Sequence, residues 1–561
     1  MRSHAEAGFP RDTHEVLNQP PPFEDVNLLD GDAALREGIE REGGGWAGAR
    51  VRAVGALAGS ARAQRLGRDA NRFGPELRTH DRFGHRIDEV EYHPAWHELM
   101  ALAMSHEAHC LPWRHPVAGA HVARSAMHSL LAQAEAGTGC PITMTFASVP
   151  ALRRQPEVAA AWEPRILSTT YDPRVVPAEG KTSVLVGMAM TEKQGGSDVR
   201  ANTTRATPVD GPGGPGGTYE LVGHKWFCSA PNSDAFLTLA RTGPGTDDRG
   251  ISCFFVPRFR PDGSRNPFAI QRLKDKLGNR SNASSEIEYR GTFAWMLGEE
   301  GRGVRTIIDM VHHTRLDCVG GSAGLMRQAL AQAVHHSRHR RAFGRRLCDQ
   351  PLMRNVLADL AVESEAATVL LLRLARAYDE LPADDGARAF ARIATALGKY
   401  WVCKRAPHMV YEAMECLGGA GYVEESVMPR LYREAPVNAI WEGSGNVICL
   451  DVLRAAGREP DALPALLGEI RLARGGDRRL DAAIDALDAE LRDPDDTEVR
   501  ARTLAERAAT ALCASLLVCH APAAVADAYC ASRLGGGRLE FGTLPAGTDF
   551  GAILARALPG D

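Results

Sequence analysis

Long hydrophobic runs are absent from this 561-residue chain. The longest one, Ala508 to Cys519, is interrupted by two hydroxyl-bearing residues. A membrane-spanning helix needs about 20 apolar residues, so we expect no spanning segment and no membrane contact. The polar N-terminal residues also lack the apolar stretch of a secretory signal. These absences predict a cytoplasmic protein.

Cysteine pairs and an excess of positive charge are also missing. The twelve cysteines include no C-x-x-C pair, which favours reduced core thiols over zinc ligands or disulfides. The net charge is −4, whereas dedicated nucleic-acid-binding domains are more often basic. Lysine is scarce, with 7 residues against 59 arginines, and we attribute this imbalance to coding bias.

Motifs for two common kinds of cofactor are absent as well. No G-x-G-x-x-G opens a helix after a strand, so a nicotinamide site is not indicated. Histidines gather at His312–His313 and again at His335, His336 and His339, but no acids stand at ligand spacing beside them. We therefore expect no metal site.

The pattern of apolar, proline and turn residues divides the chain into four segments. Residues 1–180 indicate a proline-rich arm followed by helices. Residues 181–302 alternate short apolar runs with turn residues, which predicts an antiparallel β-barrel or sandwich. Helical periodicity returns in residues 303–455 and continues through residues 456–561. The expected fold class is α+β and multidomain, with a helical, a β-barrel and a second helical domain and an extra C-terminal helical domain.

The first motif that carries chemistry runs from Met190 to Asp198 and reads MTEKQGGSD. A glycine pair lets the backbone approach a ligand closely, and neighbouring hydroxyls and amides bond to a ring edge or a phosphate. On its own, such a stretch is more often an ordinary turn between strands.

Two further motifs each have a functional and a structural interpretation. Gly223 to Ser229 reads GHKWFCS, where Trp226 either stacks on an aromatic cofactor or packs in a core. Ile440 to Asn446 reads IWEGSGN, and Glu442 stands directly before its tight Gly-Ser-Gly turn. A loop glutamate is usually solvated, but one between an aromatic residue and glycines suits a general base beside a planar ligand.

Taken together and in this order, the motifs resemble the acyl-CoA dehydrogenase superfamily of FAD enzymes. MTEKQGGSD resembles its flavin-binding loop, and RRAFG at Arg340 to Gly344 resembles its R-x-F-G segment. ECLGGAGY at Glu415 to Tyr422 is similar to its Q-x-L-G-G-x-G-Y segment, with Glu415 in place of glutamine. Pro429 to Asn446 resembles the catalytic-base loop. The substituted Glu415 either brings a charge near the cofactor or lies on a helix surface.

Other stretches resemble the AidB branch of this superfamily, the adaptive-response flavoproteins linked to DNA alkylation. They extend the resemblance to the N-terminal region and the helical tail. They are EYHPAWHELM (Glu91 to Met100), CPITMTFA (Cys140 to Ala147), LKDKLGNRSNAS (Leu273 to Ser284) and LDVLR (Leu450 to Arg454).

The resemblance implies an FAD between the β module and the following helices, contacted by three segments of the chain. The implied contacts are Met188, Ala189, Met190, Thr191, Glu192, Lys193, Gln194, Gly195, Gly196 and Ser197; Phe227, Cys228 and Ser229; and Ile440, Trp441, Glu442, Gly443, Ser444, Gly445, Asn446, Val447, Ile448, Cys449 and Leu450. It also implies a homotetramer, in which Arg341 reaches the FAD of a neighbouring subunit.

The resemblance also points to a catalytic base. Flavin-dependent dehydrogenation of an acyl-CoA removes an α-proton, which calls for a carboxylate whose pKa is raised by burial. Some relatives carry this base at the position of Thr314, the residue before Arg315, and threonine cannot serve. Glu442 therefore remains as the expected base, with a backbone N–H of its turn to polarise the thioester carbonyl.

The C-terminal segment is an ambiguous candidate for DNA binding, which the AidB branch implies for double-stranded DNA. Residues 456–561 hold 12 arginines, no lysine and 17 acids, a net charge of −5. Phosphate binding needs clustered positive charge, for which Arg454, Arg533 and Arg538 are the candidates. The alternative is a solvated helical bundle that serves oligomer packing.

These observations predict an FAD-containing protein of the AidB type that binds double-stranded DNA and protects it from alkylation. It would retain weak acyl-CoA dehydrogenase activity, as an FAD-dependent oxidoreductase of CH–CH bonds. A working dehydrogenase for short or branched acyl-CoA, with a tail used only for oligomerisation, is the first alternative. Flavin-dependent detoxification of alkylating agents is the second.

Overall fold

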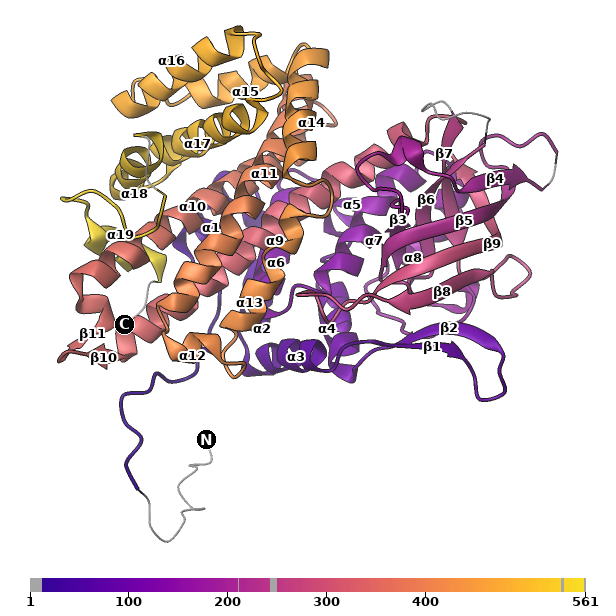
Figure 1. Cartoon of the computed structure of the whole chain (residues 1–561), viewed down its shortest axis with the longest axis horizontal. Helices are drawn as coiled ribbons and strands as arrows, with labels where there is room; N and C mark the ends of the chain where they lie inside the picture. The colour runs from indigo at the N-terminus through magenta and orange to yellow at the C-terminus, as the bar shows by residue number, and fades with distance from the viewer. Residues whose placement is uncertain (1–12, 210, 243–249, 536–538, 559–561) are drawn as a thin grey trace.

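The computed structural model describes residues 13–209, 211–242, 250–535 and 539–558. A β-sheet module lies at one end of the long axis, and the C-terminal helices lie at the other (Figure 1). Long helices fill the space between them. This confirms the expected fold class. Among the described residues, no helix is both long and apolar enough to cross a membrane.

The N-terminal segment is helical and carries one small hairpin. Its helices are α1 (Ala33–Arg41), α2 (Gly48–Ala58), α3 (Ala61–Arg72), α4 (Pro94–Ser105), α5 (Leu111–Arg114), α6 (Ala120–Ala134), α7 (Gly139–Leu152) and α8 (Pro156–Ile166). The antiparallel hairpin of β1 (Glu76–His80) and β2 (Arg86–Glu91) was not expected from the sequence. Its strands are mostly charged, so they lack the apolar alternation by which a strand is recognised.

The β module is a closed barrel. Its strands are β3 (Val186–Ala189), β4 (Arg205–Pro208), β5 (Thr218–Ser229), β6 (Ala235–Arg241), β7 (Ile251–Pro257), β8 (Phe268–Leu273) and β9 (Ser284–Leu297). The strand order β6-β4-β5-β9-β7 closes because β7 also pairs with β6. Most pairs are antiparallel, as predicted, but β3 and β4 pair with β6 in parallel. Phe236, Phe254 and Ile287 are buried in the barrel core.

Three long helices form the centre of the molecule. They are α9 (Gly303–His339), α10 (Pro351–Glu380) and α11 (Asp385–Glu415). A small hairpin of β10 (Arg341–Ala342) and β11 (Arg345–Arg346) joins the first two. The expected break near Leu417 is present, and α12 (Gly419–Tyr422), α13 (Met428–Glu434), η7 (Val437–Ala439) and α14 (Gly445–Arg458) follow it.

The C-terminal segment packs directly onto these long helices. It consists of α15 (Ala462–Arg471), α16 (Arg478–Arg492), α17 (Ala501–His520), α18 (Ala523–Tyr529), the π-helical turn η8 (Cys530–Leu534) and α19 (Phe550–Ala557). Leu466, Leu480 and Leu512 of this segment belong to the same buried apolar cluster as Leu360 and Leu397 of α10 and α11.

Arginines of the C-terminal segment also reach carboxylates of α10. The Arg533 guanidinium lies 2.6 Å from Asp359 Oδ1 and 2.8 Å from Glu363 Oε2, and its side chain is only 11% exposed. Arg556 pairs with Glu365 of the same helix at 2.9 Å. Buried ion pairs are costly to break from one side, because the remaining charge has no partner. These pairs therefore fix the last helices to the bundle.

We expect Arg533→Gln to destabilise the folded chain by about 3–5 kcal/mol, because it leaves Asp359 buried without a cation. Urea denaturation followed by circular dichroism measures the loss. Arg474→Gln is the matched control, since Arg474 pairs with Asp485 on the surface, and it should leave the midpoint unchanged. Equal midpoints for the two variants would contradict the anchoring role of Arg533.

Candidate functional site

The loop after β3 and the end of β5 lie side by side at one edge of the barrel. The Trp226 amide donates a hydrogen bond to the Thr191 carbonyl at 2.7 Å, which joins the first two sequence motifs. The amides of Gly196 and Ser197 have no hydrogen-bond partner in the part of the chain that the structure describes. The loop therefore presents free backbone donors beside an aromatic residue.

Glu192 anchors this loop from inside the barrel. Lys225 Nζ and Thr204 Oγ1 donate to Glu192 Oε1 at 2.8 and 2.6 Å, and neither charged side chain is exposed. Burial works to raise the pKa of Glu192, but the Lys225 ammonium and further hydrogen bonds lower it to about 2. Glu192 is thus a structural carboxylate that holds the loop in place.

Several of the expected FAD contacts have side chains that point into the protein. Ala189, Glu192, Cys228, Ile448 and Cys449 are all buried in the surrounding cores or pairs. Their strand and helix faces pack inward, so their side chains are not open to a ligand, and the expected FAD contacts at these positions stay a prediction. Only their backbone groups remain available to a ligand.

Phe227 and Ser229 complete the barrel edge on either side of Cys228. Phe227 is 56% exposed, and its backbone is left-handed with a φ of 58°. The Ser229 hydroxyl lies 3.4 Å from Ser284 Oγ and also contacts the Cys140 thiol at the start of α7. An exposed aromatic residue and a half-buried hydroxyl thus stand next to each other.

The third motif forms a left-handed turn between η7 and α14. Glu442 has a φ of 57° and Gly443 a φ of 103°. Left-handed backbone costs about 1–3 kcal/mol at a residue other than glycine, so the surroundings must hold Glu442 in this shape. Thr314 Oγ1 donates to Glu442 Oε2 at 2.8 Å, while Oε1 has no hydrogen-bond partner among the described residues.

Two buried cations hold the carbonyls of this turn. Arg315 Nε donates to the Glu442 carbonyl at 3.1 Å, and Lys399 Nζ donates to the Gly443 carbonyl. Lys399 lies on α11 and is 1% exposed. Arg315 and Arg392 also share Asp451 of α14, at 2.7 and 3.0 Å. Helices α9, α11 and α14 therefore meet at the Glu442 turn.

Burial raises the pKa of Glu442 above its ordinary value. The hydrogen bond from Thr314 and the charges of Arg315 and Lys399 act in the opposite direction. The balance leaves a carboxyl that gains a proton at a higher pH than a solvated glutamate does. Such a shift toward neutral pH suits a group that must both accept and release a proton.

Cys140 connects the Glu442 turn with the barrel edge. Burial raises the pKa of its thiol to about 11, the Glu442 charge adds to the rise, and Ser229 lies in hydrogen-bond contact. Glu442 and Ser229 thus both act on the same thiol. The three sequence motifs, far apart in the chain, surround one region of the molecule.

A buried polar network lies one helical turn beyond Thr314. Asp317 pairs with Arg124 of α6 and accepts a hydrogen bond from Thr143 of α7 at 2.5 Å. This network was not expected from the sequence, nor were the contacts of Lys399 and Cys140. Lys399 carried a compositional signal, since it is one of only seven lysines, whereas the network depends on pairings between distant helices.

The chemistry of the barrel edge suits an FAD. Half-exposed Met188 and Met190 and exposed Phe227 supply an apolar surface for a planar ring. The free amides of Gly196 and Ser197 supply donors for its polar edge. The residues at the barrel edge therefore fit the group.

The remainder of the third motif is divided between core and surface. Trp441 Nε1 donates to Asn438 Oδ1 at 2.9 Å, and Ile440 is 65% exposed. Asn446 accepts a hydrogen bond from Arg502 of α17 at 2.7 Å. A residue of the C-terminal segment thus contacts the start of α14 directly.

The three arginines expected to contact DNA have different surroundings. Arg454 is 54% exposed and lies 3.3 Å from Asp451. Arg533 is enclosed by Asp359 and Glu363, so this prediction needs correction: its guanidinium is not open to a phosphate. Arg538 lies outside the described residues.

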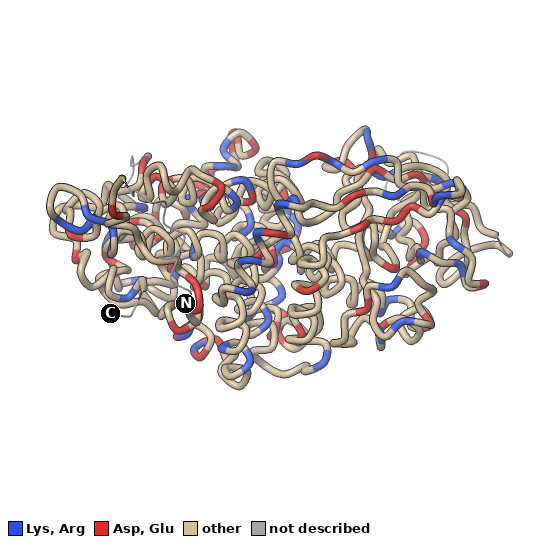
Figure 2. Tube along the Cα trace, turned by 90° about the horizontal axis from the view of Figure 1, so that it is seen from below, with Lys and Arg blue, Asp and Glu red and all other residues tan. Residues whose placement is uncertain are grey.

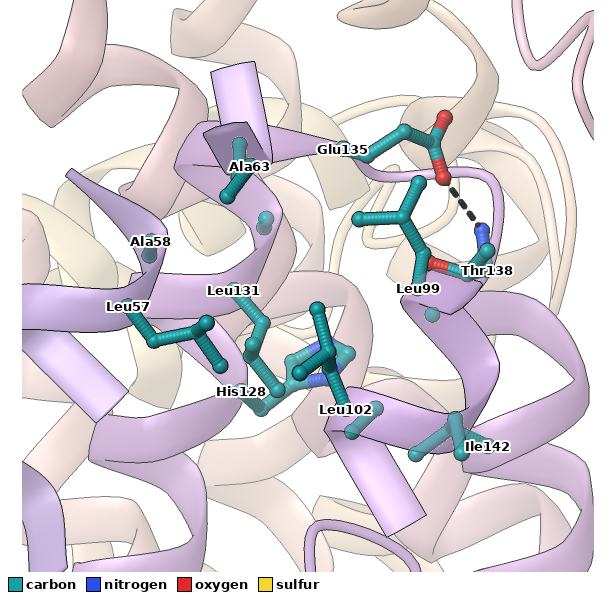
Figure 3. A pocket seen from close by; sticks show the side chains of 14 residues that line it. Leu57, Ala58, Ala63, Leu99, Leu102, His128, Leu131, Glu135, Thr138 and Ile142 are labelled. Carbon is teal, nitrogen blue, oxygen red and sulfur yellow. Dashed lines mark hydrogen bonds between the residues drawn. The ribbon is translucent and has the colours of Figure 1, made fainter. Parts of the chain in front are cut away.

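A small hollow lies between helices α2, α3, α4, α6 and α7 (Figure 3). Its volume is about 30 Å³, enough for a water molecule and far too small for a cofactor. Leucines and alanines make up most of its wall, with the His128 ring at one side. The Glu135 carboxylate nearby accepts a hydrogen bond from the Thr138 amide at 2.7 Å. The hollow is a packing feature of the N-terminal helices.

Within the described ranges, no group of three or more His, Cys, Asp or Glu side chains is placed to hold a metal ion. His339 contacts the carbonyl of His335 at 2.8 Å, and the His335 ring contacts the Pro21 carbonyl at 2.8 Å.

Known protein families match three parts of the chain. Residues 18–173 match the N-terminal domain of the adaptive response protein AidB. Residues 187–292 match the middle domain of acyl-CoA dehydrogenases, and residues 301–457 match their C-terminal domain.

Individual proteins are also similar to this chain, two of them over nearly its whole length. AidB of Escherichia coli (strain K12) is 46% identical over 533 residues, which cover 94% of this chain and 96% of that protein. The crystal structure of Caenorhabditis elegans ACDH-11 in complex with C11-CoA has a TM-score of 0.85 at 27% identity, covering 95% of each chain. Butyryl-CoA dehydrogenase of Megasphaera elsdenii, with a TM-score of 0.55 at 21% identity over 71% of this chain and 97% of that one, shares the fold.

We expect Thr314→Val to raise the pKa of Glu442 further, because the lost hydrogen bond stabilises the carboxylate. The carboxylate form then disappears at a higher pH than in the unchanged protein as the pH falls. A pH titration by difference infrared spectroscopy measures this, with Glu442→Gln identifying the band. Thr314→Ser keeps the donor and should titrate like the unchanged protein. A Val variant with an unchanged titration would exclude the hydrogen bond.

Proposed function

The chain belongs to the acyl-CoA dehydrogenase family, in its AidB branch, and from this premise we propose that Glu442 is the base that deprotonates an acyl-CoA. Members of the family are FAD-dependent oxidoreductases that act on a CH–CH bond, and FAD is the cofactor of this chain. The observation that carries the proposal is the Glu442 carboxylate, fixed through Oε2 and free at Oε1.

Glu442 would take the proton from the α-carbon of the substrate through Oε1. Thr314 keeps the other oxygen in place, so the carboxylate needs little reorientation when it accepts the proton. The Glu442 amide has no hydrogen-bond partner in the residues that the structure describes, and it would donate to the thioester carbonyl. The chemistry that FAD supplies when bound is acceptance of the hydride from the β-carbon.

The contacts to FAD are part of the same proposal. Met188, Met190 and Phe227 would pack on the ring system, and the amides of Gly196 and Ser197 would bind its polar edge. An acyl-CoA substrate is supported by the similarity to ACDH-11, whose crystal structure contains C11-CoA. We propose acyl-CoA as the substrate class for this chain.

Assembly as a cytoplasmic homotetramer also belongs to the proposal. Several large apolar side chains near the ends of the long helices are exposed, as a surface covered by another subunit would be. Phe343 is 98%, Leu352 83% and Tyr422 78% exposed. Exposed apolar residues at this density favour an interface over free surface.

We propose binding of double-stranded DNA, with protection from alkylation, as a second function. It is supported by the similarity of residues 18–173 to the adaptive response protein AidB. The acidic C-terminal segment gives it little support, because Arg533 is enclosed by two carboxylates. Of the arginines considered there, Arg454 remains exposed.

We expect Glu442→Gln to retain bound FAD but to slow flavin reduction by an acyl-CoA at least about 100-fold, because a general base contributes that much or more. Anaerobic mixing with short, branched and long acyl-CoAs, followed by flavin absorbance, measures this. Glu425→Gln removes an exposed carboxylate and should react like the unchanged protein. Rapid bleaching of the Glu442 variant would exclude it as the base.

We expect Arg454→Glu to weaken binding of a labelled DNA duplex. The slope of log affinity against log salt concentration should also become smaller by about 1, the effect of one lost phosphate contact. The change replaces an exposed cation by an anion. Fluorescence anisotropy at several salt concentrations measures both quantities, and Arg474→Glu, which makes the same change at another exposed arginine, is the control. Unchanged affinity would remove Arg454 from the interface.

A further inference from the structure

Helix α3 is held rigidly against the N-terminal helices by a face of small residues. Ala63, Gly67 and Ala70 are buried, and the Ser60 hydroxyl accepts a hydrogen bond from the Ala63 amide to begin the helix. A Cβ on Gly67 would lie 2.3 Å from the Ala134 carbonyl oxygen, so the helix axis comes very close to the end of α6. Such close packing fixes the direction of the opposite face.

That opposite face carries four arginines, which we call the arginine stripe. Arg62, Arg65, Arg68 and Arg72 are all exposed. At about 100° per residue, they fall within about 120° of the helix circumference, directly opposite the buried face. Helix α3 lies at the lower edge of the molecule in Figure 1, and Figure 2 views the molecule from that side.

Few acids neutralise the arginine stripe. Arg62 pairs with Glu98 at 2.5 Å, and Arg68 lies 4.0 Å from Asp69 with its side chain 56% exposed. Arg65 and Arg72 have no acidic partner among the described residues. Helix α3 contains four arginines and one acid, whereas residues 456–561 carry a net charge of −5. Helix α3 therefore carries an excess of positive charge, whereas residues 456–561 as a whole carry an excess of negative charge.

The cluster continues beyond the helix. The Arg280 carbonyl oxygen lies 3.3 Å from the Cβ position of Gly74, which places Arg280 beside the C-terminal end of α3. Arg280 is exposed, and its Nε donates to the Lys276 carbonyl. Arg280 thus adds one exposed cation near this end of the helix, where the Glu424 carboxylate also interacts with it.

We propose that the arginine stripe binds the phosphate backbone of duplex DNA, an inference that rests on the DNA binding proposed above. Ten residues of helix separate Arg62 from Arg72, which is about 15 Å, or the axial rise of about four phosphates on one strand. Guanidinium groups bind phosphate oxygens in a bidentate manner. A rigid row of them matches a regular row of phosphates.

An acidic membrane surface is the other large polyanion, and the helix suits it less well. A membrane-surface helix inserts its apolar face into the lipid. The apolar face of α3 is already buried against α4 and α6, so it has no such face to insert. Only the arginine side chains of α3 are left to make a contact. Such a purely ionic contact is typical of nonspecific binding to a nucleic-acid backbone.

The test compares three forms of the FAD-loaded full chain. The first is unchanged, and the second carries Arg65→Gln, Arg68→Gln and Arg72→Gln. The third carries Arg290→Gln, Arg388→Gln and Arg474→Gln, which remove the same charge from exposed ion pairs elsewhere. Fluorescence anisotropy with a labelled duplex of about 30 base pairs, at about 50–200 mM salt, gives the affinity and its salt dependence.

We expect the stripe variant to lose affinity at least tenfold, with a salt slope smaller by about 2–3, while the control variant binds like the unchanged chain. Equal losses of affinity in both variants would mean that binding follows the net charge of the protein. That result would overturn the arginine stripe as the binding site. Binding by the unchanged chain with no loss in the stripe variant would overturn the site but leave DNA binding standing. No binding by any form would overturn DNA binding itself.

A last experiment distinguishes duplex DNA from an acidic membrane surface as the bound polyanion. Vesicles of phosphatidylglycerol and phosphatidylcholine are sedimented with the same three forms. We expect no sedimentation that depends on the arginine stripe. Stripe-dependent binding to vesicles at salt concentrations that abolish duplex binding would overturn DNA as the partner.

Discussion

Two buried cations hold the backbone turn that presents Glu442, and the arrangement of the helical core depends on them. Arg315 and Lys399 each donate to one carbonyl of a turn whose two residues are both left-handed. The turn stays in this shape because residues of both α9 and α11 hold it. Asp451 of α14 neutralises Arg315 in turn, so three helices meet at a single polar junction.

The scarcity of lysine has a structural meaning that composition alone did not reveal. Several of the seven lysines make specific buried contacts: Lys181 with Asp234, Lys225 with Glu192, and Lys399 with the Gly443 carbonyl. A compact ammonium fits at a buried carbonyl or carboxylate where the wider guanidinium does not. These three lysines thus have specific structural roles beside the many arginines.

The sequence was sufficient for the fold class, the barrel, the break after α11 and the grouping of three distant motifs. It was insufficient for the roles of individual charged side chains. Glu192 and Arg533 both looked available for ligands, and both are enclosed by partners from distant parts of the chain. Charge counts along a sequence do not show which charges pair. The β1–β2 hairpin was missed for a related reason, because its strands contain few apolar residues.

The helices after residue 455 share one hydrophobic core with α10 and α11. This C-terminal helical domain therefore shares its buried apolar cluster with the central bundle. A chain shortened at this point would expose leucines of the bundle to water, and it would aggregate or rearrange. Such a deletion could not show what the last helices bind, so their contribution has to be studied by single substitutions within the intact chain.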